Sequence, residues 1–124
     1  VLVIDDEPII RKITQAILDE CGYTVMLAED GNEGISLYKK NRDKIRMVLL
    51  DLIMPQKDGL ETAEELIEFD PEVKIILASG FKEDKRVEKI LTLGVKKFIQ
   101  KPYTTENLSK SIYEILYPAE NQHV

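Results

Sequence analysis

The stretch that decides the fold is Val1-Leu2-Val3-Ile4-Asp5-Asp6-Glu7, an apolar run of strand length that ends in acidic residues. Four more short apolar runs follow along the chain, separated by amphipathic stretches. Runs rich in Val, Ile and Leu that lack polar alternation are typical of strands covered on both faces, as in a parallel sheet. The four further predicted strands are Thr24–Ala28, Met47–Leu50, Val73–Ala78 and Phe98–Gln100.

Apolar residues recur at helical spacing in the five stretches that separate or follow these runs. The weakest pattern contains Gly34, which lowers helix propensity. Five strands alternating with five helices predict an α/β fold with a doubly wound parallel sheet, whose site lies beyond the carboxyl ends of the strands. The apolar positions are Ile10, Ile13 and Ile17; Ile35 and Tyr38; Leu60, Ala63, Leu66 and Ile67; Val87, Ile90 and Leu91; and Leu108, Ile112, Ile115 and Leu116.

Turn and cap residues agree with this division. Gly22 and Gly94 follow helical stretches as C-terminal caps, and Thr104 or Thr105 is placed to cap the last helix. Pro118 ends that helix. We therefore expect a single domain over residues 1–117, followed by a tail over residues 118–124.

Composition excludes several classes of function. The 124 residues include 17 Lys and Arg against 23 Asp and Glu, a net charge of −6, which argues against direct binding of nucleic acid. No apolar run reaches the roughly 18 residues of a membrane span, and no signal peptide is visible, so we expect a cytoplasmic location. Because the sequence starts without Met, we expect either a trimmed product or a fragment of a longer protein.

Two residue types that often carry chemistry are nearly absent. Cys21 is the single cysteine, which excludes an internal disulfide framework. His123 is the single histidine and stands in a polar tail. Ser-His-Asp catalysis, Cys-His catalysis and histidine-rich zinc sites are therefore not expected.

Chemistry-bearing residues stand at the ends of four predicted strands. The first strand ends in Asp5-Asp6-Glu7, the third in Asp51, the fourth in Ser79-Gly80 and the fifth in Lys101-Pro102. Each alone has an ordinary reading as a helix cap, turn residue or surface side chain. In a doubly wound sheet, however, these strand ends converge on one crevice. The set predicts a site containing carboxylates, a hydroxyl group and an ammonium group.

Electrostatics suggests what this site does. Two carboxylates about 4 Å apart repel each other by about 4 kcal/mol at an effective dielectric constant of 20, so three in one crevice need a cation. Ligands that are all oxygen select a hard ion, Mg²⁺ or alternatively Mn²⁺. An Asp carboxylate next to that ion can act as a nucleophile towards a phosphoryl group and form an aspartyl phosphate. Lys101 and Ser79 are then suited to hold the other phosphoryl oxygens.

Four motifs occur in a fixed order over most of the chain. They are Val1-Leu2-Val3-Ile4-Asp5-Asp6-Glu7; Asp51-Leu52-Ile53-Met54-Pro55 with Asp58-Gly59; Ala78-Ser79-Gly80; and Phe98-Ile99-Gln100-Lys101-Pro102. In order and spacing, the chain from Val1 to about Tyr117 resembles the receiver domain of two-component response regulators. Each motif is weak alone, but the ordered set is highly specific.

The resemblance implies a CheY-like, flavodoxin-like fold with five flanking helices and the strand order 2-1-3-4-5. Asp51 is then the phosphoacceptor. The implied Mg²⁺ ligands are Asp6, Asp51 and the backbone carbonyl of Ile53, with Asp5 acting through a water molecule. Ser79 and Lys101 bind the phosphoryl group, and the bond before Pro102 is expected to be cis, as X-Pro bonds can be.

The resemblance also implies a switch and partners. Ser79 and Phe98 are the switch residues, although Thr and Tyr are common in these places. A histidine kinase or histidine phosphotransfer domain donates the phosphoryl group and docks beside the first helix, where Ile9 is a candidate contact or an ordinary exposed side chain. The surface formed by the fourth helix, fifth strand and fifth helix is read by a partner. The domain itself is expected to be no enzyme beyond its own phosphorylation and dephosphorylation.

Local departures from the family pattern lead to more specific expectations. Lys96-Lys97 replaces the acidic pair found in many relatives that dimerise through the fourth helix and fifth strand, so we do not expect that dimer. The segment 77–81 is similar to receivers attached to hybrid sensor histidine kinases, so a covalently linked kinase or output domain is an option. Ile53 and Phe81 take the two positions that flank the path of the hydrolytic water, and their apolar side chains predict a long-lived phosphoaspartate.

Three other functions fit the sequence less well. A Mg²⁺-dependent phosphohydrolase acting through an aspartyl phosphate requires a second Asp two residues after the nucleophile, where Ile53 stands. A nucleotide- or flavin-binding module requires a glycine-rich phosphate loop after the first strand, where Asp5-Asp6-Glu7 stands instead. A degenerate receiver that takes no phosphate is disfavoured because all five site residues are present.

Overall fold

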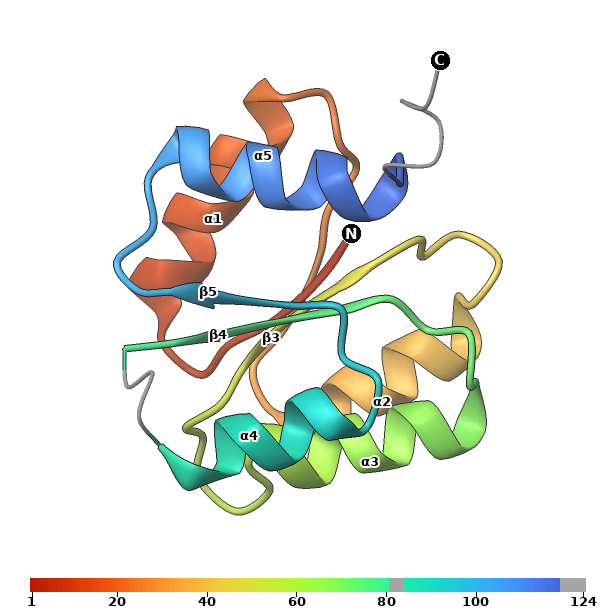
Figure 1. The fold of residues 1–124 in the computed structure, drawn as a ribbon. Helices are drawn as coiled ribbons and strands as arrows, with labels where there is room; N and C mark the ends of the chain where they lie inside the picture. The colour runs from red at the N-terminus through yellow and green to blue at the C-terminus, as the bar shows by residue number, and fades with distance from the viewer. Residues whose placement is uncertain (81–83, 119–124) are drawn as a thin grey trace.

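The computed structural model describes residues 1–80 and 84–118. Strands and helices alternate along the chain, and a layer of helices covers each face of one central sheet (Figure 1). In chain order the elements are β1 (Leu2–Ile4), α1 (Pro8–Glu20), β2 (Met26–Ala28), α2 (Gly31–Lys40), β3 (Val48–Asp51), α3 (Gly59–Phe69), β4 (Ile75–Ser79), α4 (Lys85–Thr92), β5 (Lys97–Gln100) and α5 (Thr105–Leu116).

All five strands are parallel, in the order β2-β1-β3-β4-β5. Leu2 pairs with Met26 of β2 on one side and with Val48 of β3 on the other. Every residue of β1, β3 and β4 is buried, which explains the lack of polar alternation in their sequences. The predicted fold class and strand order are confirmed.

The two faces of the sheet form two hydrophobic cores. Side chains alternate between the faces of a strand, so Leu2 and Ile4 join one core while Val3 joins the other. The first core is closed by α2, α3 and α4, and the second by α1 and α5 (Figure 1). Gly34 lets α2 approach closely, because a Cβ atom there would lie 2.3 Å from the Cδ1 atom of Ile4. Close packing thus explains the glycine in the weakest predicted helix.

The predicted helix ends agree with the backbone geometry. Gly22 and Gly94 have positive φ angles of 90° and 105°, just after α1 and α4. The Thr104 hydroxyl group accepts a hydrogen bond from the Asn107 backbone N–H at 3.0 Å and so caps α5. The predicted tail beyond residue 118, including His123, lies outside the described residues.

Two of the apolar residues that recur at helical spacing are exposed. Ile13 is 49% exposed and Leu91 is 41% exposed. Both recur at helical spacing with buried or half-buried neighbours, but each lies at the edge of the apolar face of its helix, beyond the part that the sheet covers. Within the described ranges, no helix is both long and apolar enough to cross a membrane.

Candidate functional site

The carboxyl ends of four strands bring the predicted site residues together. Asp51 and Ser79 are the last residues of β3 and β4, while Asp5 and Lys101 directly follow β1 and β5. A cavity of about 370 Å³ opens at this edge of the sheet, and Asp51, Ser79 and Lys101 line it together with Asp6 and other neighbours. Residues nearly a hundred positions apart in sequence therefore meet in one site.

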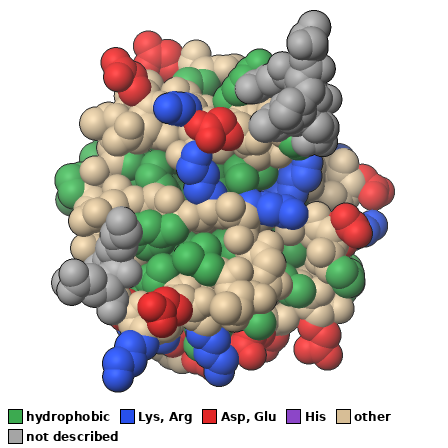
Figure 2. All heavy atoms as spheres, in the orientation of Figure 1, with side chains coloured by type: hydrophobic (Ala, Val, Ile, Leu, Met, Phe, Trp, Pro, Cys, Tyr) green, Lys and Arg blue, Asp and Glu red, His purple; other side chains and the backbone are tan. Residues whose placement is uncertain are grey.

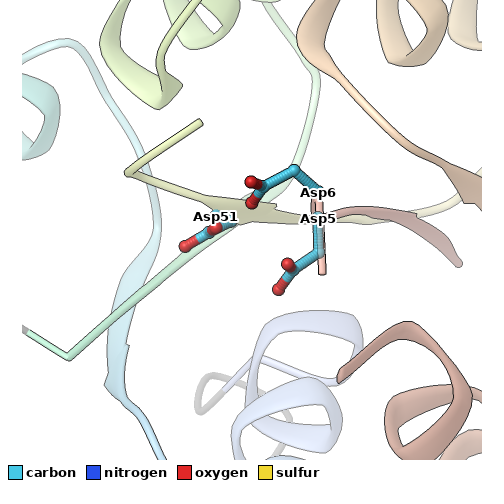
Figure 3. A group of neighbouring side chains, drawn as sticks. All are labelled: Asp5, Asp6 and Asp51. Atoms are coloured by element: carbon cyan, nitrogen blue, oxygen red, sulfur yellow. The ribbon is translucent and has the colours of Figure 1, made fainter. Parts of the chain in front are cut away.

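Three carboxylates form the acidic part of this site. One oxygen each of Asp5, Asp6 and Asp51 lies within 4.8 Å of the others. Figure 3 shows the three side chains at the ends of neighbouring strands. Asp5 and Asp51 are only 3% and 5% exposed, so water screens their mutual repulsion poorly.

Lys101 compensates part of this negative charge. Its Nζ atom lies 2.7 Å from Oδ2 of Asp5 and 3.2 Å from Oδ1 of Asp51. Burial acts to lower the pKa of Lys101, but the bonds to these two carboxylates outweigh it and raise the pKa above its usual value. For Asp51, burial dominates over the attraction of Lys101 and raises the pKa of the carboxyl group to about 7.

The two acidic residues after β1 differ in their bonding. The Oδ1 atom of Asp5 accepts a hydrogen bond from the Glu7 backbone N–H at 2.9 Å. Among the described residues, Oδ1 of Asp6 is the one buried side-chain oxygen that lacks a hydrogen-bond partner. An unsatisfied buried carboxylate oxygen beside two other carboxylates fits a cation. Because all these donors are oxygen, the set fits a hard divalent ion.

A backbone hydrogen bond and close backbone packing hold the two ends of the loop between Asp51 and α3 together. The Gly59 backbone N–H donates to the carbonyl oxygen of Leu52 at 2.7 Å. A Cβ atom at residue 59 would lie 2.6 Å from the carbonyl oxygen of Asp51, so only glycine fits there. Ile53 also lines the cavity and its side chain is 44% exposed. Gln56 has a φ of 67°, an unfavourable angle for a residue other than glycine.

Comparison with known proteins identifies this arrangement. The family model of the response regulator receiver domain matches residues 1–113. The chain belongs to this family. Receiver domains are the signalling phosphoacceptors of two-component systems, and the acidic cluster of Asp5, Asp6 and Asp51 is consistent with a phosphoacceptor site.

Individual relatives agree with this assignment. The chain is 34% identical over 117 residues to the chemotaxis protein CheY of Treponema pallidum, covering 94% of this chain and 81% of that protein. It is 29% identical to the sensor kinase CckA of Brucella abortus, covering 94% of this chain but 12% of the kinase. The CheX–CheY–BeF₃–Mg²⁺ complex of Borrelia burgdorferi superimposes with a TM-score of 0.88 at 28% identity, covering 93% of this chain and 87% of that one.

The predicted switch and loop residues of this receiver domain are placed as follows. Phe98 lies in β5, half-buried against the core closed by α2, α3 and α4. The Lys101–Pro102 peptide bond is cis. The backbone N–H of Lys101 donates to the carbonyl oxygen of Ser79 at 2.9 Å, which ties the ends of β4 and β5 together. Phe81 lies outside the described residues.

Sequence reasoning missed two supports of the receiver site. Arg11 donates from Nη1 to the backbone carbonyl oxygen of Asp5 at 2.7 Å and so fixes the turn after β1. The hydroxyl groups of Thr14 and Tyr103 are hydrogen-bonded, which ties the loop after Lys101 to α1. Thr14 and Tyr103 are 89 positions apart, and no sequence pattern marks their contact.

Proposed function

We propose that Asp51 of this receiver domain accepts a phosphoryl group from a phosphohistidine, with Mg²⁺ bound in the acidic cavity. One observation carries the proposal: Asp6, Asp51, Ser79 and Lys101 line one cavity at the strand ends, and the Asp5 carboxylate lies beside Lys101 and the other two carboxylates. The donor is a histidine kinase or a histidine phosphotransfer domain, since these proteins present a phosphohistidine to receiver domains.

The chain's own residues hold the metal ion and the nucleophile. Asp6, Asp51 and the backbone carbonyl of Ile53 are the proposed direct ligands, and Asp5 acts through a water molecule. The buried Asp6 oxygen that lacks a partner supports this assignment. When bound, Mg²⁺, or Mn²⁺ in its place, neutralises charge on the carboxylates and the phosphoryl oxygens.

The reaction follows from the position of Asp51. Its carboxylate forms a bond to phosphorus while the bond from phosphorus to the donor's histidine nitrogen breaks, and the electron pair of that bond returns to the imidazole. Lys101 faces Asp51 and favours its ionised form, as the nucleophile requires. Lys101 and the Ser79 hydroxyl group then hold phosphoryl oxygens, replacing the contacts that Lys101 makes with carboxylates here.

Phosphorylation then shifts an existing equilibrium between two forms of the domain. Ser79 moves towards the phosphoryl group, and the space that it leaves lets the Phe98 ring turn inwards. The surface of α4, β5 and α5 changes as a result. Figure 2 shows apolar side chains on this face among both basic and acidic ones, and we propose that a protein partner binds it.

The donor is expected to dock beside α1. Ile9 is 71% exposed and Ile13 is 49% exposed on this helix. A cavity of about 390 Å³ lies between α1 and the loop after β5, lined by Ile13, Lys101, Tyr103 and neighbouring residues. A partner's apolar side chain in this cavity would place its histidine close to Lys101 and hence to Asp51.

The broader setting of the domain is also a proposal. We assign residues 1–117 to the receiver domain and residues 118–124 to a tail. The similarity to a sensor kinase over a small part of that kinase supports linkage of this domain to a kinase or another output domain. We place the domain in the cytoplasm with its proposed kinase partner and propose no membrane insertion of this segment. Its net charge of −6 argues against direct binding of nucleic acid.

The competing function is a phosphohydrolase that turns over through an aspartyl phosphate. Such an enzyme needs a general acid beside the nucleophile, two residues further along the chain. Ile53 holds that position, and its side chain cannot transfer a proton. Self-phosphorylation and self-dephosphorylation are therefore the only reactions that we assign to the domain.

Incubation with Mg²⁺ and acetyl phosphate, followed by intact mass measurement, tests the proposal. We expect one hydroxylamine-sensitive phosphoryl adduct on the unaltered protein and none on the Asp51→Asn variant. Asp43→Asn, at an exposed surface position, is the matched control and should keep the adduct. An adduct that persists in Asp51→Asn, or no adduct on any form, contradicts the proposal. Repeated turnover of a phosphate ester would favour the phosphohydrolase.

A further inference from the structure

Arg86 joins the first turns of two neighbouring helices. Its Nη1 atom lies 3.0 Å from Oδ2 of Asp58, the N-cap residue of α3. Its Nε and Nη2 atoms lie 3.1 Å and 2.8 Å from the two carboxylate oxygens of Asp84, the N-cap residue of α4. The three charged side chains are 20–37% exposed, so each is mostly shielded from water. We call this group the Arg86 bridge.

One side of the Arg86 bridge is fixed to the phosphoryl site. Asp58 caps α3 by accepting the Glu61 backbone N–H at 3.0 Å. The next residue, Gly59, donates its N–H to the carbonyl oxygen of Leu52 and packs against the backbone of Asp51. Asp58 is therefore held close to the phosphoacceptor by short, well-packed backbone contacts.

The other side belongs to the connection from β4 to α4. β4 ends at Ser79, and α4 begins at Lys85. Val87 and Ile90 are the buried residues of this eight-residue helix, and its other residues are half-buried or exposed. These two apolar side chains attach α4 to the core, and polar contacts at the start of the helix add to what holds its position. At its first turn, the Arg86 bridge supplies them.

We propose that Arg86 is a positioning residue that holds α4 in the unphosphorylated arrangement, so that the bridge opposes the switch. This inference rests on the proposed function, in which Ser79 moves towards a phosphoryl group on Asp51. That movement displaces the start of the β4–α4 connection, while Asp58 stays fixed to the backbone beside Asp51. The two N-cap carboxylates then shift relative to each other, and the Arg86 bridge resists the shift.

Thermodynamic linkage makes this inference measurable. If the bridge favours the unphosphorylated form, its removal makes occupation of the phosphoryl site easier, and occupation in turn loosens the bridge. A brace that only supports the fold stabilises both forms equally and leaves the affinity of the site unchanged. The affinity of the phosphoryl site therefore separates a switch element from a structural support.

Two variants open the Arg86 bridge from opposite sides. Arg86→Gln removes the cation, and Lys85→Gln is its control: it makes the same charge change one residue earlier, at an exposed side chain. Asp58→Asn removes the anion but keeps an oxygen that caps α3. Its control is Asp30→Asn, at the N-cap of α2, which makes no ion pair within the described part of the chain.

The probe is beryllofluoride with saturating Mg²⁺, and its dissociation constant is measured by calorimetry. We expect Arg86→Gln and Asp58→Asn to bind on the order of fivefold more tightly than the unaltered protein, within the usual range of coupling between sites. The two controls should bind as the unaltered protein does. Hydrogen exchange in the protein without Mg²⁺ or beryllofluoride should be faster at the α4 amides of Arg86→Gln than of Lys85→Gln.

The outcomes distinguish the two proposals. Unchanged or weaker beryllofluoride binding by both bridge variants, with normal binding by the unaltered protein, overturns the role of Arg86 and leaves the proposed function standing. If the unaltered protein does not bind beryllofluoride, the result contradicts the proposed function. The role proposed for Arg86 then falls as well, because it rests on that function. If Arg86→Gln does not fold, Asp58→Asn decides the matter alone.

Discussion

The Nζ atom of Lys101 lies 3.2 Å from Oδ1 of Asp51. Asp51 ends β3 and Lys101 follows β5, and these two strands are not neighbours in the sheet. β4 lies between β3 and β5, so Lys101 reaches across the end of β4 to meet the carboxylate. The same Nζ atom is 2.7 Å from Oδ2 of Asp5. One ammonium group thus holds two buried carboxylates together.

Replacing Lys101 by Met should raise the pKa of Asp51 above its value of about 7. Lys101 is the main group that lowers this pKa against the effect of burial. Carbon-13 NMR titration of the aspartate carboxyl groups in the metal-free protein measures the change. Lys85→Met, which removes an exposed lysine, is the control. An Asp51 pKa that stays the same or falls would show that the ion pair with Lys101 does not stabilise the ionised form of Asp51.

The raised pKa of Asp51 also predicts how stability depends on pH. The folded-state pKa of about 7 exceeds the ordinary value of 3.8, so the folded form holds this proton more tightly than the unfolded form. The tighter binding of this proton raises the free energy of unfolding by its full amount below about pH 4, and this gain is lost as pH rises through 7. Without Mg²⁺ at pH 8, Asp51→Asn should therefore raise the free energy of unfolding, on the order of 2 kcal/mol after allowing for screening.

Urea denaturation at pH 5 and pH 8 checks this expectation. The advantage of Asp51→Asn should shrink at pH 5, where the native carboxyl group is mostly protonated. Asp43→Asn, at an exposed position, should show no such pH dependence. A stabilisation of Asp51→Asn that is equal at both pH values would rule out titration of Asp51 as its cause.

The unpartnered oxygen of Asp6 predicts a metal-dependent gain in stability. At a Mg²⁺ concentration ten times its dissociation constant, the free energy of unfolding should rise by about 1.4 kcal/mol in the unaltered protein. Asp6→Asn should lose most of this gain, because an amide is a poorer ligand than a carboxylate. Thermal unfolding with and without Mg²⁺ measures the effect, with Asp43→Asn as control. A full gain in Asp6→Asn would place the ion elsewhere.

The exposed side chain of Ile53 predicts a slow loss of the phosphoryl group. Ile53 lines the cavity and has no polar atom that could orient a hydrolytic water molecule. We expect Ile53→Asn to shorten the half-life of the phosphorylated protein about tenfold, as one added water-orienting contact can. Decay is followed by intact mass, and Ile9→Asn is the control. A half-life of seconds in the unaltered protein would refute the shielding role.

The sequence predicted those features that depend on local patterns. Apolar runs without polar alternation predicted the buried strands, and the glycines at 22 and 94 predicted helix ends, where both residues have positive φ angles. The site could be anticipated because parallel strands place their carboxyl ends at one edge. Asp51 and Lys101 therefore needed no long-range information beyond the order of the strands.

The rest depended on contacts that local patterns do not encode. Helical periodicity shows which side chains share a face, but not how far the sheet covers that face, and the exposure of Ile13 and Leu91 could not be read from it. The Tyr103 contact with Thr14 and the Arg86 contact with Asp58 depend on how separate loops and helices pack. Such pairs are set by tertiary packing, which a single sequence does not reveal.

The most direct test of the central claim is to locate the phosphoryl group on the chain. The protein is phosphorylated with acetyl phosphate and Mg²⁺, reduced with borohydride, which converts a phosphoaspartate to homoserine, and analysed by peptide mass spectrometry. The account predicts homoserine at residue 51 and at no other aspartate. Homoserine at Asp5, Asp6 or any position outside the cavity, with residue 51 unmodified, would contradict it.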